Sequence, residues 1–159
     1  MKTQAAAPIR VRLARTADAA AILALEESFP GDRMSARSVR RFLASPSACV
    51  YVAAVGGATV GALVLLLRRN MRWARVYSVV VHPRYRGRGL GRRLIRAAEA
   101  AARRSGRRGV SLEVRADNAP ARGLYRSLGY MEDEQLPGYY EDGAPGVRLR
   151  KPFGLRMRN

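Results

Sequence analysis

The stretch YSVVVHPRYRGRGLGRRL, residues 77 to 94, joins an apolar run to a turn rich in glycine and arginine. The β-branched run is typical of a buried strand. The residues after the turn predict an amphipathic helix over 90–106, because apolar side chains recur on one face at Leu90, Leu94, Ile95, Ala98 and Ala101. A helix N-terminus exposes unpaired N–H groups and a partial positive charge, so the order strand, turn, helix predicts an anion site.

The three glycines of the turn, Gly87, Gly89 and Gly91, let a backbone curl around a diphosphate without obstruction by a Cβ atom. The interleaved side chains of Arg86, Arg88 and Arg92 add positive charge. The spacing is G-x-G-x-G, which differs from the dinucleotide fingerprint G-x-G-x-x-G and from the P-loop, which needs G-K-[ST]. The patterned flanks argue against a flexible basic linker, whereas a generic tight turn stays open as an alternative.

The rest of the chain predicts a mixed α/β sheet with helices on its faces. A Gly56-Gly57 hairpin joins two strands of an expected antiparallel meander, and the helix over 90–106 should make the next strand parallel to an earlier one. The expected strands are 9–15, 49–55, 58–69, 74–82, 109–115, 130–136 and 146–153, and the expected helices are 19–27, 36–45, 90–106 and 119–129.

A chain of 159 residues fits a single domain, with a core expected over about 8–153. Cys49 is the only cysteine, so neither an internal disulfide nor a cysteine-based zinc site can form, and no metal is expected. The N-terminus lacks a signal-peptide core, and the longest apolar run, 61–67, is too short to cross a bilayer. We therefore expect a cytoplasmic protein without membrane contact; no pattern indicates its oligomeric state.

The formal net charge is +18, which favours polyanionic partners such as RNA, the ribosome or a phosphorylated cofactor. All the basic residues except Lys2 and Lys151 are arginine, a bias that a GC-rich genome would also produce. Any nucleic-acid contact is expected only through this basic surface. Five of the twelve acids fall within 132–142, where they either receive a cationic partner or balance arginine-rich neighbours.

Two segments resemble the GCN5-related N-acetyltransferase (GNAT) family. RGRGLG, residues 86 to 91, is similar to the family's R/Q-x-x-G-x-G/A motif. LEVRADNAPARGLYRSLGY, residues 112 to 130, is similar to the RimI-type group, which acetylates the N-terminal alanine of a ribosomal protein, and to its archaeal relatives. The spacing of the two segments also agrees. The resemblance implies a largely antiparallel twisted sheet with flanking helices and a central strand-turn-helix site for acetyl-CoA.

The resemblance also implies roles for individual residues. Backbone groups of Val79, Val80 and Val81 should contact the pantetheine arm and the thioester. Residues predicted to bind the cofactor at the turn and beyond it are Arg86, Gly87, Arg88, Gly89, Leu90, Gly91, Arg92 and Asn118. Glu113 matches the general base and Tyr125 the general acid. Phe29, Tyr139 and Tyr140 are expected to contact the acceptor.

The chemistry of acetyl transfer suits this assignment. An amine must be neutral to attack a thioester, so a base must take its proton directly or through water. A carboxylate in a dry cleft, as expected for Glu113, has a raised pKa and is a better base near neutrality. Tyr125 can give the departing thiolate a proton or a hydrogen bond. Direct transfer is expected, because no activated cysteine nucleophile is visible.

Simpler structural roles remain open for the same residues. Glu113 could be a strand residue paired with an arginine, Tyr125 a core aromatic and Asn118 a helix N-cap. Three functions are therefore carried forward: acetylation of a protein or peptide N-terminus, possibly of a ribosomal protein; acetylation of a small amine such as an amino acid, a polyamine or an aminoglycoside; and an inactive nucleic-acid-binding module. The loop FPGDRMSARS, residues 29 to 38, lacks the aromatic FPW-type segment of the RimI pattern, which weakens the case for a ribosomal protein.

Overall fold

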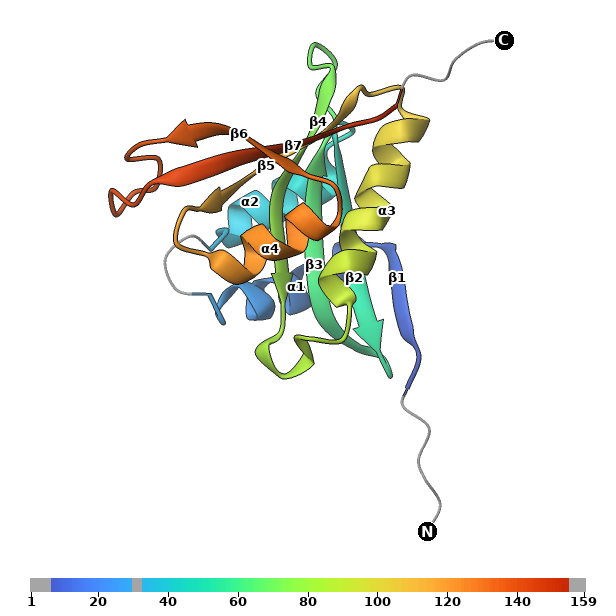
Figure 1. Cartoon of the computed structure of the whole chain (residues 1–159). Helices are drawn as coiled ribbons and strands as arrows, with labels where there is room; N and C mark the ends of the chain where they lie inside the picture. The colour runs from blue at the N-terminus through green and yellow to red at the C-terminus, as the bar shows by residue number, and fades with distance from the viewer. Residues whose placement is uncertain (1–6, 30–32, 155–159) are drawn as a thin grey trace.

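The structure is a computed structural model that describes residues 7–29 and 33–154. It is a mixed α/β fold built on a seven-stranded sheet, in the order β1-β2-β3-β4-β5-β7-β6 (Figure 1). The strands are β1 Ile9–Leu13, β2 Ala48–Val55, β3 Ala58–Leu66, β4 Trp73–Val81, β5 Gly109–Arg115, β6 Met131–Leu136 and β7 Gly146–Pro152. The helices are α1 Ala19–Glu26, α2 Ala36–Ala44, α3 Leu90–Arg104 and α4 Ala119–Ser127, with short 3-10 helices η1 Thr16–Asp18 and η2 Pro83–Tyr85.

The topology confirms the meander and the crossover. Strands β1 to β4 are antiparallel, and Gly56 and Gly57 take φ angles of 56° and 84°, as the tight hairpin between β2 and β3 requires. After α3, β5 runs parallel to β4. The last two strands form a hairpin in which β7, the final strand of the chain, lies between β5 and β6.

Several elements end earlier than the sequence pattern predicts. β3 stops at Leu66 rather than at residue 69, because Leu67 is followed by the exposed Arg68 and Arg69, where the chain begins to turn towards β4. α3 ends at Arg104, and Gly106 follows with a φ of 70°. Ser35 caps the start of α2, since its Oγ accepts a hydrogen bond from the Ser38 N–H at 3.1 Å.

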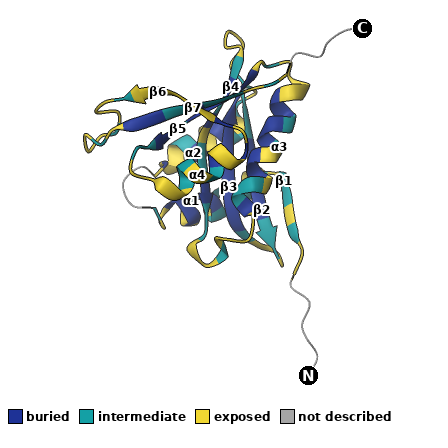
Figure 2. Ribbon diagram, viewed as in Figure 1, coloured by how far each residue is buried: buried dark blue, intermediate teal, exposed yellow. Residues whose placement is uncertain are grey.

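Helices cover both faces of the sheet. α3 and α4 lie on one face and α1 and α2 on the other (Figure 1), and the buried residues form one cluster on each side (Figure 2). Side chains alternate along β3, so that Leu63 and Leu65 enter the α3 cluster while Val64 and Leu66 enter the α1–α2 cluster. Within the described ranges, no helix combines the length and apolar character needed to cross a bilayer.

The parallel pair β4–β5 separates halfway along its length. Its pairing runs only from Trp73 opposite Gly109 to Val76 opposite Leu112. At that point β4 bulges, because β3 pairs with Val76 and then with Ser78 and skips Tyr77. The distal half of β4 therefore keeps its partner β3 and lacks one on the β5 side, which opens the sheet next to the glycine-rich turn (Figure 1).

Gly109 stands where Trp73 of β4 and the backbone of β7 leave no room for a Cβ atom. A Cβ atom there would lie 2.5 Å from Cζ3 of Trp73 and 2.9 Å from Cα of Pro152, and closer still to the carbonyl oxygen of Lys151. We expect Gly109→Ala to lower the free energy of unfolding by about 2–3 kcal/mol, measured by urea denaturation, since two of the obstructing atoms are backbone. The control is Gly123→Ala in α4, where a Cβ would meet nothing within 4 Å. It should raise stability by about 0.5–1 kcal/mol. Equal stabilities for the two variants would contradict this account of the packing.

Candidate active site

A cavity of about 650 Å³ lies where the glycine-rich turn, the start of α3, β4 and α4 meet. It is lined by nine of the eleven residues predicted to bind the cofactor, namely Val79, Val81, Arg86, Gly87, Gly89, Leu90, Gly91, Arg92 and Asn118. Phe29 and Tyr125 also line it. The turn, the strand before it and the helix after it thus face one space, as the sequence order predicts.

The glycines shape the turn in two ways. Gly87 and Gly89 each have a φ of 77°, and Gly89 is the N-cap of α3, so the chain enters the helix through a left-handed residue. Gly91 is helical, and a Cβ there would lie 3.5 Å from Cδ2 of Leu124 in α4. The first-turn N–H groups of α3 have no partner within the helix and are available to an anion.

Two of the residues predicted to bind the cofactor do not line this cavity. The side chain of Val80 is buried in the α1–α2 cluster on the opposite face of the sheet, whereas its backbone, which is the predicted contact, stays in β4 between Val79 and Val81. The Arg88 guanidinium lies over the ring of Tyr85, 5.1 Å from its centroid, and Arg88 does not line the cavity. Arg86, by contrast, lines the cavity and stacks over Phe29 at 5.1 Å.

A second cavity, of about 410 Å³, occupies the gap between the diverging strands β4 and β5. Glu113, Tyr77 and Tyr140 are among its lining residues. It shares five lining residues with the first cavity: Phe29, Val79, Asn118, Ala121 and Tyr125. The two spaces therefore adjoin, and the shared residues lie at their junction.

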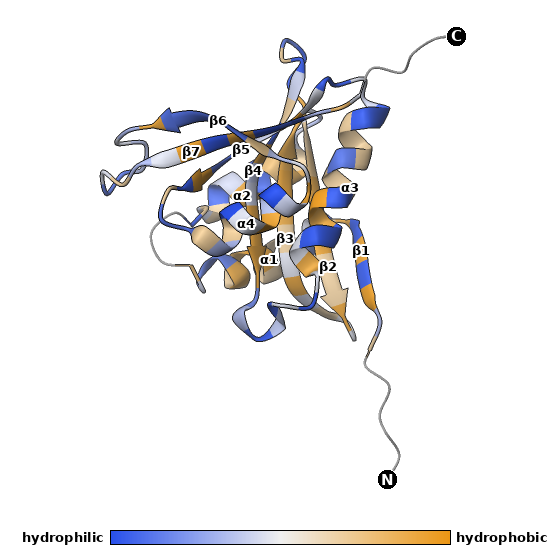
Figure 3. Ribbon diagram, viewed as in Figure 1, coloured by the Kyte–Doolittle hydropathy of each residue, from blue (hydrophilic) through white to orange (hydrophobic). Residues whose placement is uncertain are grey.

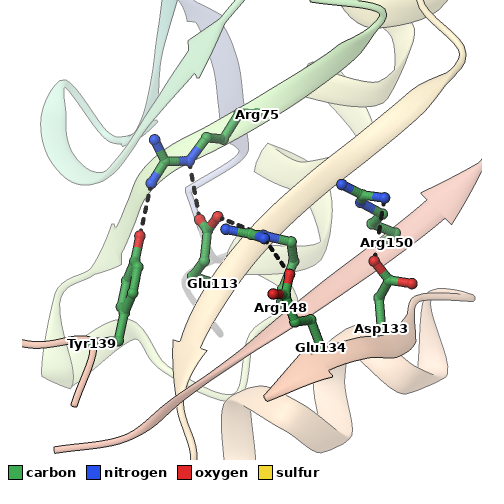
Figure 4. Close-up of polar contacts among 7 residues, drawn as sticks. All are labelled: Arg75, Glu113, Asp133, Glu134, Tyr139, Arg148 and Arg150. Atoms are coloured by element: carbon green, nitrogen blue, oxygen red, sulfur yellow. Dashed lines mark hydrogen bonds and ion pairs between the residues drawn. The ribbon is translucent and has the colours of Figure 1, made fainter. Parts of the chain in front are cut away.

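Glu113 lies in a chain of charged groups that crosses four strands, with Arg75 in β4, Arg148 in β7 and Glu134 in β6 (Figure 4). Its side chain is only 7% exposed; Oε2 accepts from Arg75 Nε at 3.0 Å and Oε1 from Arg148 Nε at 3.2 Å. Arg148, directly opposite Glu113 in the sheet, also pairs with Glu134 at 2.5 Å. The geometry matches the simpler role of a strand carboxylate paired with arginine, yet a carboxylate has about four acceptor positions and keeps room for a further donor.

Tyr125 is buried in α4, with 4% of its surface exposed, at the junction of the two cavities. Burial raises the pKa of its hydroxyl, so the group stays protonated at neutral pH. Among the described residues, the hydroxyl has no hydrogen-bond partner, while the ring packs edge-on against Tyr130. The side chain is thus both a core aromatic and a wall of the site.

Asn118 and the paired tyrosines are placed by local contacts. Asn118 is the N-cap of α4, as the simpler interpretation has it, and its Oδ1 accepts from the Ala121 N–H at 3.2 Å. It also borders both cavities. Tyr140 lines the second cavity. Tyr139 packs edge-on against the ring of Tyr140, and its hydroxyl accepts a hydrogen bond from Arg75 at 3.1 Å.

Glu26, the last residue of α1, lines the second cavity and was not predicted from the sequence. It is 3% exposed; its carboxylate accepts from the Met34 N–H at 2.9 Å and from Ser78 Oγ at 3.4 Å. Burial raises the pKa of this carboxyl above 4.5. Helical spacing could have revealed it, since Glu26 lies four residues after the buried Ile22.

The acids of the late hairpin mostly face arginines of this chain. Four of the five are ion-paired: Glu132 with Arg122, Asp133 with Arg150, Glu134 with Arg148 and Asp142 with Arg115. This pairing favours the interpretation in which the acids balance arginine-rich neighbours. The described part of the chain also brings together no group of three His, Cys, Asp or Glu side chains that could hold a metal ion.

Comparison with known proteins identifies the family of the chain. The family model described as Acetyltransferase (GNAT) family matches residues 19–130. The chain belongs to the GNAT family. The N-alpha-acetyltransferase RimI of Mycobacterium tuberculosis is 36% identical over 152 residues, which cover 92% of this chain and 94% of that protein. The chain is accordingly an N-acetyltransferase.

Solved structures share the fold. The ribosomal-protein-S18-alanine N-acetyltransferase from Escherichia coli superimposes with a TM-score of 0.85 at 23% identity, covering 96% of this chain and 98% of that one. A putative streptothricin acetyltransferase from Bacillus anthracis, solved in complex with acetyl coenzyme A, gives a TM-score of 0.77 at 18% identity, covering 94% and 100%. At these identities the likeness establishes the architecture.

The buried carboxyl of Glu26 should give stability a distinct pH dependence. Because its pKa is higher in the folded protein than in the unfolded chain, its charge destabilises the fold at neutral pH. This cost disappears as the pH falls through the folded pKa towards the unfolded value near 4.5. We therefore expect wild type to gain stability relative to Glu26→Gln as the pH is lowered from 8 to 4.5 in urea unfolding. Parallel pH profiles for the two proteins would contradict this electrostatic account.

Proposed function

We propose that the chain transfers an acetyl group from acetyl-CoA directly to the N-terminal α-amino group of a protein or peptide. The observation that carries the proposal is the pair of adjoining cavities, one built around an anion-binding turn and one between the separated strands. The relative from M. tuberculosis, named an N-alpha-acetyltransferase, supports this type of acceptor. The name of the E. coli neighbour makes a ribosomal protein a candidate substrate.

The first cavity suits the cofactor. N–H groups of residues 87 to 92 would bind the pyrophosphate, with Arg86 and Arg92 beside it. The backbone of Val79 to Val81 faces the gap where β4 has no partner on the β5 side, so its free polar groups can bind the amides of the pantetheine arm. Asn118, on the wall that both cavities share, would contact the cofactor there. Acetyl-CoA would supply the activated acetyl group.

Glu113 and Tyr125 would divide the proton chemistry between the two cavities. Glu113 lines only the second cavity and is proposed to take the proton of the acceptor ammonium, directly or through water. Arg75 and Arg148 fix the orientation of its carboxylate. Tyr125, which borders both spaces, would donate to the sulfur that leaves; its raised pKa makes it a persistent hydrogen-bond donor.

The second cavity would receive the acceptor. Phe29 and Tyr140 line it, and Tyr139 supports Tyr140 from outside. Its volume of about 410 Å³ also falls within the range of small-molecule pockets, which keeps a small amine as the second candidate acceptor. A panel of acceptors distinguishes the two: peptides with varied first residues against amino acids, polyamines and aminoglycosides.

We expect turnover on N-terminal peptides to exceed turnover on every small amine, and Glu113→Gln and Tyr125→Phe each to lower kcat by about 10²-fold or more. The control is Glu132→Gln, because that acid is ion-paired on the exposed hairpin and lines neither cavity. Wild-type kcat in both site variants would refute the catalytic assignment while leaving the fold and the family intact.

The turn can be tested separately by binding. Gly89→Ala should raise the Kd for CoA at least tenfold in calorimetric titration, because an L residue resists the left-handed conformation that starts α3. Gly106→Ala is the matched control, with a φ of 70° at the other end of α3 and nothing within 4 Å of a Cβ. Both variants should lose about 1 kcal/mol of stability, and only the first should lose affinity. Equal affinities would contradict the placement of the pyrophosphate.

A further inference from the structure

Two loops at one end of the molecule gather seven arginines and no acid. The first is residues 67–73, the connection from β3 to the first residue of β4. The second is residues 103–109, which run from the last turn of α3 to the first residue of β5, and both lie at the end opposite the glycine-rich turn (Figures 1 and 3). The arginines are Arg68, Arg69, Arg72, Arg103, Arg104, Arg107 and Arg108. All are exposed except Arg107, which is half-buried. We refer to this surface as the arginine end.

The two loops are fastened to each other. The Arg108 N–H donates to the carbonyl oxygen of Arg72 at 2.8 Å. The Arg107 guanidinium donates to three carbonyl oxygens of the first loop, those of Leu67 at 3.2 Å, Arg68 at 2.5 Å and Met71. One arginine therefore serves as an internal clamp between the two segments, and the other six are exposed.

The positive charge of the arginine end is not neutralised within the fold. Across residues 7–29 and 33–154, none of the seven arginines makes an ion pair. At the late hairpin, by contrast, four acids are each matched with an arginine. Repulsion between like charges held close together lowers the stability of a folded protein. Folding alone therefore gives no reason for the unpaired arginines of the arginine end.

We propose that the arginine end is a docking surface for the phosphodiester backbone of a nucleic acid. A guanidinium group can donate two parallel hydrogen bonds to two phosphate oxygens, and it can stack on a flat ring. Arg103 shows such stacking within the fold, since its guanidinium lies 4.2 Å from the ring centroid of Phe153. An acidic protein is a poorer fit for this surface, because the core of a protein–protein interface is depleted of charged residues. The arginine end offers little apolar surface for such a core, since its exposed large apolar side chain is Met71.

The arginine end is remote from the acetyl-transfer site. α3 has 15 residues and spans about 22 Å, with the glycine-rich turn at its start and the arginine end at its other end. A nucleic acid bound there leaves both cavities open. The inference goes beyond the proposed function and does not rest on it.

The test measures binding of fluorescein-labelled 20-nucleotide RNA and DNA by anisotropy over a series of KCl concentrations. The variant carries Arg68→Gln, Arg69→Gln, Arg72→Gln and Arg108→Gln and leaves the Arg107 clamp in place. The control removes the same charge from exposed positions elsewhere, by Arg10→Gln, Arg37→Gln, Arg40→Gln and Arg96→Gln. Thermal melts check that both proteins fold.

We expect the variant to bind at least tenfold more weakly at 50 mM KCl, and its plot of log affinity against log salt to flatten by about 3 on single-stranded RNA. The control should stay close to wild type. Comparison of RNA with DNA identifies which nucleic acid is preferred. Equal losses in variant and control would show that net charge alone attracts the strand and would overturn the proposal. Absence of RNA and DNA binding by wild type would also overturn the proposal. So would a competition experiment in which polyglutamate or phosphatidylserine vesicles displace the labelled strand as effectively as unlabelled RNA does at equal charge.

Discussion

The separation of β4 from β5 after Val76 and Leu112 is the constraint on which the site depends. A parallel pair that continued would satisfy the backbone of β4 on both sides and close the gap. Instead the bulge at Tyr77 turns β4 away, while β5 pairs with β7 along its whole length and follows the late hairpin. One cavity then forms within the gap, and the other forms between β4 and the start of α3. The residues that line both cavities lie where the gap meets the space beside α3.

Arginine plays three different parts in this molecule. At the late hairpin it is matched by acids, which stabilises the register of β6 against β7. Arg148 also pairs with Glu113, which stabilises the register of β7 against β5. At Arg107 it replaces missing backbone partners and shapes a loop. At the arginine end it has no counter-charge. A GC-rich genome would produce many arginines, but it would not explain why acids accompany them at the late hairpin and are missing from the arginine end.

Much of the fold could be predicted from the sequence, because its signals are local. The Gly56-Gly57 hairpin, the Ser35 cap and the face of α3 each depend on residues a few positions apart. The place of β7 between β5 and β6 could not be predicted, since strand order depends on contacts between distant residues. The glycine-rich turn was found through its order in the chain. For Val80 the sequence predicts a backbone contact only, and strand alternation sends its side chain to the opposite face. Helical spacing indicates the burial of Glu26, but its partners, Met34 and Ser78, come from other elements and could not be predicted.

The Glu113 cluster shows why a structural and a chemical role need not compete. Two guanidinium groups hold the carboxylate from opposite oxygens, and Arg148 is itself shared with Glu134. A carboxylate held in this way cannot rotate freely, which fixes the direction in which its remaining lone pairs point. Arg75 also donates to Tyr139, which packs on Tyr140 at the wall of the second cavity. One arginine thus ties the proposed base to the proposed acceptor site, so the ion pairs that would suffice for a structural role also supply the preorganisation that proton transfer requires.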